Sequence, residues 1–247
     1  MAPSKTFLNI DNCVLKPNSL KYITNRLLIN DETLREIYFN NKCLDECDVI
    51  KIAKTLHYNT QLKILKLIDV DLSINSVIEI ANALRVNNTL EELDIRWNKI
   101  SYRGARLIFS ALRKNVGLKK LNMSGIGMGS FHGSSLAKML KHNKSLQKLD
   151  VSWNLMDQSS VVEIIHALDK NVSLESLYIC GNDNLELVAA EIEKMLKHNH
   201  VLKKIDIVTT QYYSFSRKYA FLRDLLHSNV VLVNECELIS QYLILIN

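Results

Sequence analysis

The chain has 247 residues, of which 47% are hydrophobic and 23% charged, and it contains only 2 prolines. This composition is too apolar for a disordered chain, and the formal net charge of +5 is too small for a dedicated nucleic-acid binder. No segment approaches the roughly 20 apolar residues that cross a membrane, so we expect a folded protein whose partner is neither nucleic acid nor a membrane.

Residues 1–33 contain a short alternating segment followed by a helical one. Leu8 and Ile10 alternate as in a strand, and the stretch SLKYITNRLLIN has its apolar residues at helical spacing. An array of repeats needs an atypical unit at each end, because an end unit has a neighbour on one side only. We therefore expect residues 1–33 to form the N-terminal cap of a repeat array.

A leucine recurs every 28 residues from Leu34 to Leu202, and each of them opens a segment that follows or approaches LxxLxL. The apolar residues of these segments alternate, which predicts a short strand. About ten residues later the spacing changes to i, i+3, i+4, i+7, as it does between Ala105 and Leu112, and this is one face of an amphipathic helix. About seven strand-and-helix units over residues 34–229 predict a single α/β domain.

An asparagine also recurs every 28 residues, from Asn59 to Asn199, where we expect each helix to end. Asparagine tolerates the left-handed backbone conformation that closes many helices, which would explain its return. Three of the four glycosylation sequons lie on this column, at Asn87, Asn143 and Asn171, so we attribute them to the repeat. The mostly basic residues beside the column either face the negative helix ends or form an edge for an acidic partner or phosphates.

The segment SGIGMGSFHGSS, residues 124–135, carries four glycines between a predicted strand and a predicted helix. Loops that bind phosphate occupy such a place, but this segment lacks the GK[ST] ending and its glycine spacing fits neither common fingerprint. It forms either a tight or flexible loop of the array or an anion site at the start of the helix.

The end of the chain departs from the repeat. After Leu202 the spacing slips by two residues, and the aromatic stretch QYYSFSRKYAF takes up the change. Residues 230–247 are strongly apolar. They form either a C-terminal cap over the last repeat or a surface that binds another chain.

The repeat has a recognisable family pattern. Between Leu90 and Asn115 the sequence follows LxxLxLxxNxIxxxGaxxLxxaLxxN almost completely, with Asn98, Ile100 and Gly104 at the loop positions. It resembles the ribonuclease-inhibitor-like leucine-rich repeat, a class shared with NOD-like receptors, Ran GTPase-activating protein and tropomodulin. The resemblance implies an α/β leucine-rich repeat solenoid, a horseshoe arc with a parallel β-sheet on the concave face and α-helices on the convex face. It says little about function, since the family serves many partners.

In such a solenoid the strand side chains that do not enter the core line up in columns on the concave face. Here these columns are polar and aromatic, and binding hot spots are enriched in Trp, Tyr and Arg. Trp97 and Trp153 hold the same place two units apart, where each indole either meets a partner or packs into the turn after its strand. The predicted protein-binding residues are Tyr38, Lys66, Glu92, Asp94, Arg96, Trp97, Asp150, Trp153 and Tyr178.

No pattern in the sequence supports catalysis. We find no nucleophile–base pair, and the histidines are not spaced as metal ligands. Cys43 and Cys47 could share a helix face but would make an incomplete metal site. We therefore predict a non-enzymatic interaction module or scaffold without cofactor or metal, a monomer by default, that binds a protein of unknown identity.

Two other functions remain open. A small-GTPase regulator resembling Ran GTPase-activating protein would need a loop arginine, for which Arg103 is the candidate, and an acidic tail, whereas this tail is apolar. A cytoskeletal, tropomodulin-like actin-binding protein would have a helical N-terminal region that this chain lacks. The 5 cysteines are odd in number and form no CxxC pair, and no signal-like segment is present, so we expect a reduced, cytoplasmic protein.

Overall fold

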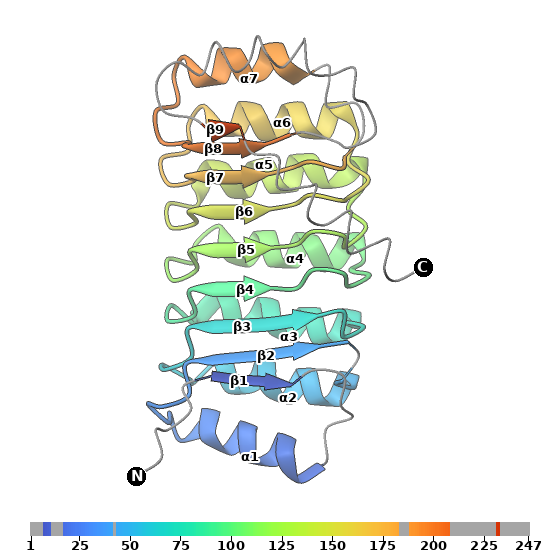
Figure 1. The fold of residues 1–247 in the computed structure, drawn as a ribbon, viewed down its shortest axis with the longest axis vertical. Helices are drawn as coiled ribbons and strands as arrows, with labels where there is room; N and C mark the ends of the chain where they lie inside the picture. The colour runs from blue at the N-terminus through green and yellow to red at the C-terminus, as the bar shows by residue number, and fades with distance from the viewer. Residues whose placement is uncertain (1–6, 11–16, 42, 183–187, 208–230, 233–247) are drawn as a thin grey trace.

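The computed structural model of the protein describes residues 7–10, 17–41, 43–182, 188–207 and 231–232. Within them, nine strands pair in sequence order, all parallel, in one sheet. The helices between successive strands lie together on one face of this sheet (Figure 1). We call the other face, which carries no described helix, the open sheet face. This two-layer stack is the predicted leucine-rich-repeat solenoid.

Each repeat up to residue 196 contributes one short strand and one helix. The strands are β1 (Phe7–Ile10), β2 (Glu36–Asn40), β3 (Ile64–Ile68), β4 (Glu92–Asp94), β5 (Lys120–Asn122), β6 (Lys148–Asp150), β7 (Ser176–Tyr178), β8 (Lys204–Asp206) and β9 (Val231–Leu232). The helices are α1 (Pro17–Leu28), α2 (Glu46–Leu56), α3 (Ile74–Val86), α4 (Tyr102–Leu112), α5 (Gly133–His142), α6 (Gln158–Leu168) and α7 (Ala189–Leu196), with a 3-10 turn, η1, at Ser130–His132. The strand and helix expected in residues 1–33 are present as β1 and α1.

The 28-residue spacing sets the register of the sheet. Leu93 pairs with Leu65 on one side and with Leu121 on the other, and all three side chains are buried. The predicted apolar face of α4, between Ala105 and Leu112, is buried as well. Strand and helix therefore contribute to one continuous core, as the two periodicities predicted.

The recurring asparagines do not end the helices in the left-handed conformation, so that part of the sequence analysis is wrong. Asn87 and Asn143 have φ values of −78° and −71° with extended ψ. No residue of the column is among the described residues with positive φ. The reason for the recurrence is a side-chain contact between repeats, which we call the asparagine ladder: Asn59, Asn87, Asn115, Asn143, Asn171 and Asn199.

Asn115 shows how a rung of the ladder works. Its side-chain nitrogen donates to the carbonyl oxygens of Leu84 and Asn87, both at 2.8 Å, in the preceding repeat. Its side-chain oxygen accepts from the amides of Gly117 and Leu118, at 3.1 and 2.8 Å. One buried amide thus serves four backbone groups where a helix ends and the next strand begins, and buried polar groups of this kind need partners.

The ladder also accounts for the aligned sequons. Asn87, Asn143 and Asn171 are all buried, with 3–6% of their surface exposed. The third sequon residue has a structural role too, since the Ser145 hydroxyl donates to the carbonyl of Asn115 at 3.0 Å. Both positions of these sequons are therefore explained by hydrogen bonds within the stack.

Several predictions for the C-terminal part lie outside the described residues. These are the register slip after Leu202, the aromatic stretch 211–221 and the cap or binding surface at residues 230–247. The described strand β9 pairs Val231 with Lys204, an offset of 27 residues, whereas β2 to β8 pair at 28. The repeat is thus one residue shorter at that step.

Among the described cysteines, Cys180 is in a disulfide, while Cys43 and Cys47 are not disulfide-bonded. The expectation of a fully reduced chain therefore fails at Cys180. The described residues contain no helix that is both long and apolar enough to cross a membrane. They also contain no group of three or more His, Cys, Asp or Glu side chains that could hold a metal ion.

Candidate functional site

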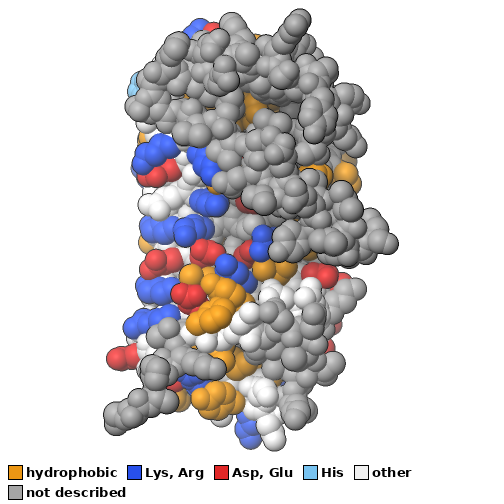
Figure 2. Space-filling model, in the orientation of Figure 1, with side chains coloured by type: hydrophobic (Ala, Val, Ile, Leu, Met, Phe, Trp, Pro, Cys, Tyr) orange, Lys and Arg blue, Asp and Glu red, His pale blue; other side chains and the backbone are white. Residues whose placement is uncertain are grey.

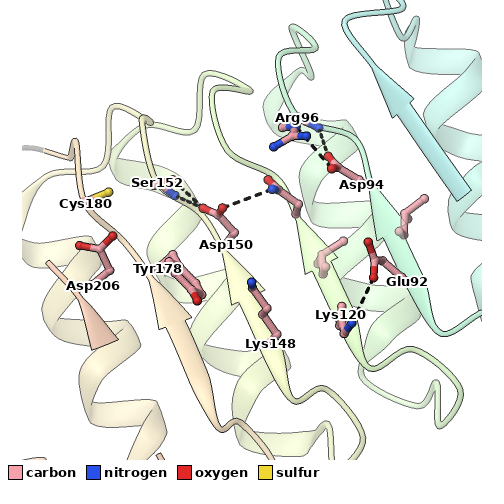
Figure 3. A pocket seen from close by; sticks show the side chains of 13 residues that line it. Glu92, Asp94, Arg96, Lys120, Lys148, Asp150, Ser152, Tyr178, Cys180 and Asp206 are labelled. Carbon is pink, nitrogen blue, oxygen red and sulfur yellow. Dashed lines mark hydrogen bonds and ion pairs between the residues drawn. The ribbon is translucent and has the colours of Figure 1, made fainter. Parts of the chain in front are cut away.

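The outward-facing side chains of β4 to β8 line a pocket of about 410 Å³ on the open sheet face (Figure 3). Five of the nine predicted binding residues are among its walls. The lining residues are Glu92, Leu93, Asp94, Arg96, Lys120, Leu121, Asn122, Lys148, Asp150, Ser152, Tyr178, Cys180 and Asp206. The period-2 alternation of the strands makes this pocket, because it sends every second side chain away from the core.

The residues at the strand starts form a charged row. Glu92 lies between two lysines, with its carboxylate oxygens 3.3 Å from the ammonium of Lys66 and 3.3 Å from that of Lys120. The next residue of the row, Lys148, places its ammonium 4.5 Å from the centre of the Tyr178 ring. Figure 2 shows blue and red side chains close together along this side of the molecule.

Asp94 and Asp150 lie deeper, where β4 and β6 end. The carboxylate of Asp94 accepts from the amide of Arg96 at 3.2 Å and lies 3.4 Å from its guanidinium. The carboxylate of Asp150 accepts from the amide and the hydroxyl of Ser152, at 3.0 and 2.5 Å. Each aspartate thus accepts a hydrogen bond from the backbone two residues later. This contact is an Asx turn, and it ends the strand.

Burial raises the pKa of the Asp94 carboxyl, and the Arg96 guanidinium partly offsets this rise. Burial likewise raises the pKa of the Asp150 carboxyl, while the hydrogen bonds from Ser152 act in the opposite direction. Desolvation is the larger cause in both cases because a carboxylate loses its hydration below the surface. The two predicted acids are therefore mainly internal supports of the pocket floor.

Tyr38 and Lys66 belong to the open sheet face but lie outside the pocket. The Tyr38 hydroxyl donates to Glu36 at 2.9 Å, and the Lys66 ammonium lies 4.3 Å from the centre of the Tyr38 ring. Burial, followed by the hydrogen bond to Glu36, raises the pKa of Tyr38 to about 12. Because Lys66 also pairs with Glu92, Tyr38 and Lys66 are in contact with the charged row that lines the pocket.

Trp97 and Trp153 also lie outside the pocket, at a turn with a left-handed backbone. Their φ values are 60° and 54°, and the equivalent residues between and after them are Gly125 and Gly181. A Cβ built on Gly125 would lie 2.2 Å from the Trp97 ring, and one on Gly181 would lie 2.9 Å from the Trp153 ring. Each indole thus packs on the glycine of the next repeat, so both have a structural role, and contact with a partner stays a prediction.

The glycine segment 124–135 is a tight loop whose amides are largely occupied. The amides of Ile126 and Met128 donate to the side-chain oxygen of Asn154, at 3.1 and 3.0 Å. The amide of Gly129 donates to Nδ1 of His132 at 3.0 Å. These bonds leave few donors for an anion and favour the structural alternative.

His132 gives this loop a predicted pH dependence. Only 5% of the residue is exposed, and burial lowers the pKa of the imidazole below its usual value. The unfolded chain then binds more protons than the folded one as the pH falls below about 6.5, so acidification costs stability. We expect His132→Asn to make unfolding less dependent on pH than in the wild type.

Urea unfolding at pH 7.5 and 5.5 measures this effect. The stability difference between the wild type and His132→Asn should shrink as the pH falls, since Asp94 and Asp150 contribute equally to both proteins. An exposed control at the far end of α5, His142→Asn, should follow the wild-type curve. A difference that is constant between the two pH values would show that His132 is not the group responsible.

The structure changes the list of site residues in two ways. It adds Lys120, Lys148 and Asn122, which flank the buried leucines of β5 and β6 and are neither aromatic nor acidic. It also places Arg103, which is exposed, in the first turn of α4, so the loop arginine expected of a GTPase regulator is not on a loop.

Comparison with known proteins agrees with the repeat architecture. The chain matches a family model described as a leucine-rich repeat at residues 86–109 and 142–157. No curated protein matches it. It is similar to the solved structure of leiomodin-1 actin-binding site 2, with 25% identity, a TM-score of 0.56 and coverage of 63% of this chain and 91% of that chain. A likeness to the tropomodulin C-terminal domain of Caenorhabditis elegans has 11% identity, a TM-score of 0.40 and coverage of 84% and 93%, and supports no further inference.

Proposed function

We propose that the chain, which is a leucine-rich-repeat protein of the ribonuclease-inhibitor-like type, is a non-enzymatic module that binds a protein partner on its open sheet face. The observation that carries the proposal is the pocket across β4 to β8, a hollow on the face that the helices leave uncovered. Its walls combine an arginine, two lysines and a tyrosine with buried carboxylates. Interfaces concentrate their binding energy in such tyrosine and arginine anchors.

Affinity capture followed by mass spectrometry tests the proposal. The informative variant is the pair Asp94→Asn and Arg96→Ala, which removes both members of an ion pair, so that neither charge is left buried without the other. Loss of a central arginine costs more than about 1 kcal/mol, so we expect recovery of the partner to fall by about tenfold.

The matched control is Arg113→Ala, which removes an exposed arginine at the end of α4. It should retain wild-type capture. Thermal unfolding of all proteins checks that the pocket variant is folded. Equal capture by the wild type and the folded pocket variant would place the interaction elsewhere and refute the proposal.

Actin is a second candidate partner, and the similarity to leiomodin-1 actin-binding site 2 is what favours it. Co-sedimentation with filamentous actin and binding to monomeric actin test it directly. If actin is the partner, the pocket variant should reduce binding and Arg113→Ala should not. If the chain bound neither form of actin, actin would be excluded as the partner, and the proposal of a protein-binding module would be unaffected.

A cytoplasmic location belongs to the same proposal. Subcellular fractionation tests it: the chain should be recovered with cytosolic marker proteins and without those of the secretory compartments. Recovery in a secretory or extracellular fraction would contradict a cytoplasmic location and would agree with the disulfide at Cys180, since the cytosol keeps most thiols reduced.

A further inference from the structure

The exposed charges of the pocket differ from its buried charges. Asp94 is 5% exposed, and the carboxylates of Asp94 and Asp150 accept bonds from the backbone of their own turns. By contrast, 57% of the Lys120 side chain is exposed, and Lys148 is exposed as well. A partner approaching the open sheet face therefore meets ammonium groups before it meets carboxylates.

Lys120 and Lys148 stand directly opposite each other. They are paired residues of the neighbouring strands β5 and β6, so their backbones are about 4.8 Å apart. Like charges in this position destabilise a sheet. Lys120 shares the Glu92 carboxylate with Lys66, while Lys148 forms no ion pair in the part of the chain that the structure describes and rests against the Tyr178 ring. An anionic partner would relieve this repulsion.

We propose, building on the proposed function, that the partner presents an extended acidic segment whose carboxylates bind Lys120 and Lys148. Side chains on one side of an extended segment recur about every 6.8 Å, twice the rise per residue. Two flexible lysine stems on adjacent strands can meet carboxylates at that spacing. The segment therefore carries Asp or Glu at alternate positions and runs across the strands.

The surrounding carboxylates favour a peptide over a nucleic acid. Glu92 lies between Lys66 and Lys120, and Asp150 lies two residues beyond Lys148 on the same strand. A backbone with a phosphate at every unit would bring negative charge against these acids. A peptide with carboxylates at alternate residues can pair with the lysines and place neutral side chains beside Glu92 and Asp150.

Fluorescence anisotropy with the full chain tests this inference. The probe is a labelled peptide of alternating Glu and Ser, and the control peptide has Gln in place of Glu. We expect saturable binding of the acidic peptide only, weakened when NaCl is raised from about 50 to 300 mM, because salt screens exposed charges. Reversing both lysines, Lys120→Glu with Lys148→Glu, turns two attractions of up to about 1 kcal/mol into repulsions and should weaken binding by about tenfold or more.

The matched control is Lys114→Glu with Lys141→Glu, which makes the same change in net charge on exposed lysines at the helix ends. It should change affinity by less than about twofold. A neutral variant, Lys120→Gln with Lys148→Gln, should also lose binding while its melting temperature stays equal or rises, since the repulsion is gone. Equal losses in the control variant, no saturable binding, or tighter binding of a single-stranded oligonucleotide than of the peptide would each overturn the inference.

The same variants separate this inference from the proposed function. If the Asp94→Asn/Arg96→Ala protein fails to capture its natural partner while the Lys→Gln protein captures it normally, the pocket binds a protein and the acidic segment is refuted. If neither protein differs from the wild type in capture, both the site and the segment are refuted.

Discussion

Replacing Asn115 by alanine should lower the free energy of unfolding by about 3–5 kcal/mol, one of the largest effects available from a single polar side chain. The change leaves two carbonyl groups and two amides without their partners in an interior where Asn115 is only 3% exposed. Each buried polar group left unsatisfied costs about 1–3 kcal/mol, and local rearrangement keeps the sum below full additivity. Urea denaturation at neutral pH measures the loss.

Two further variants test why the asparagine is there. If the position only needed a left-handed backbone, Asn115→Gly would be neutral, because glycine adopts that conformation most easily. The ladder predicts that Asn115→Gly is about as destabilising as Asn115→Ala. The exposed neighbour Asn88, whose side chain makes one contact of 3.4 Å with the amide of Val116, is the control, and Asn88→Ala should cost less than about 0.5 kcal/mol. A stable Asn115→Gly protein would refute the ladder as the source of stability.

Asn115 also shows where sequence reasoning reached its limit for this fold. The period of 28 predicted the strand register and the buried faces, because a repeat must present the same apolar side chains to each neighbour. The period also predicted where the asparagine recurs. Backbone propensity, however, could explain the asparagine only by the conformation of that one residue. Two of its four hydrogen bonds join residues 28 and 31 positions apart, and no local preference contains that information.

The candidate site, too, could be predicted from the sequence only in part. The outward columns could be listed from alternation alone, and five predicted residues do line the pocket. Alternation does not show which of these side chains are exposed, because burial also depends on the turns and on the neighbouring strands. Asp94 is therefore predicted on the open sheet face although its carboxylate is buried. Lys148 alternates with the core residues of β6 in the same way, but its position opposite Lys120 and beside Tyr178 follows only from the pairing of β6 with β5 and β7.

Trp97 and Gly125 should behave as one unit in a double-mutant cycle. Gly125 has φ of +63°, and an added Cβ would lie 2.2 Å from the Trp97 ring. We expect Gly125→Ala to cost about 2–4 kcal/mol, the sum of about 1–2 kcal/mol for a left-handed alanine and about 1–3 kcal/mol for overpacking, with partial relaxation of the ring. In a Trp97→Ala background the same change should cost only the backbone part, which gives a coupling of about 1–3 kcal/mol.

Gly127 supplies the control for this cycle because it isolates the backbone part. Its φ is +81°, yet a Cβ there would have nothing within 4 Å. Gly127→Ala should therefore cost about 1–2 kcal/mol whether residue 97 is tryptophan or alanine. Equal costs for Gly125→Ala in the two backgrounds would mean that the half-buried indole swings away freely, and tryptophan fluorescence would then shift toward that of an exposed ring. In that case the turn would not need the indole for stability, and contact with a partner would become the better explanation of Trp97.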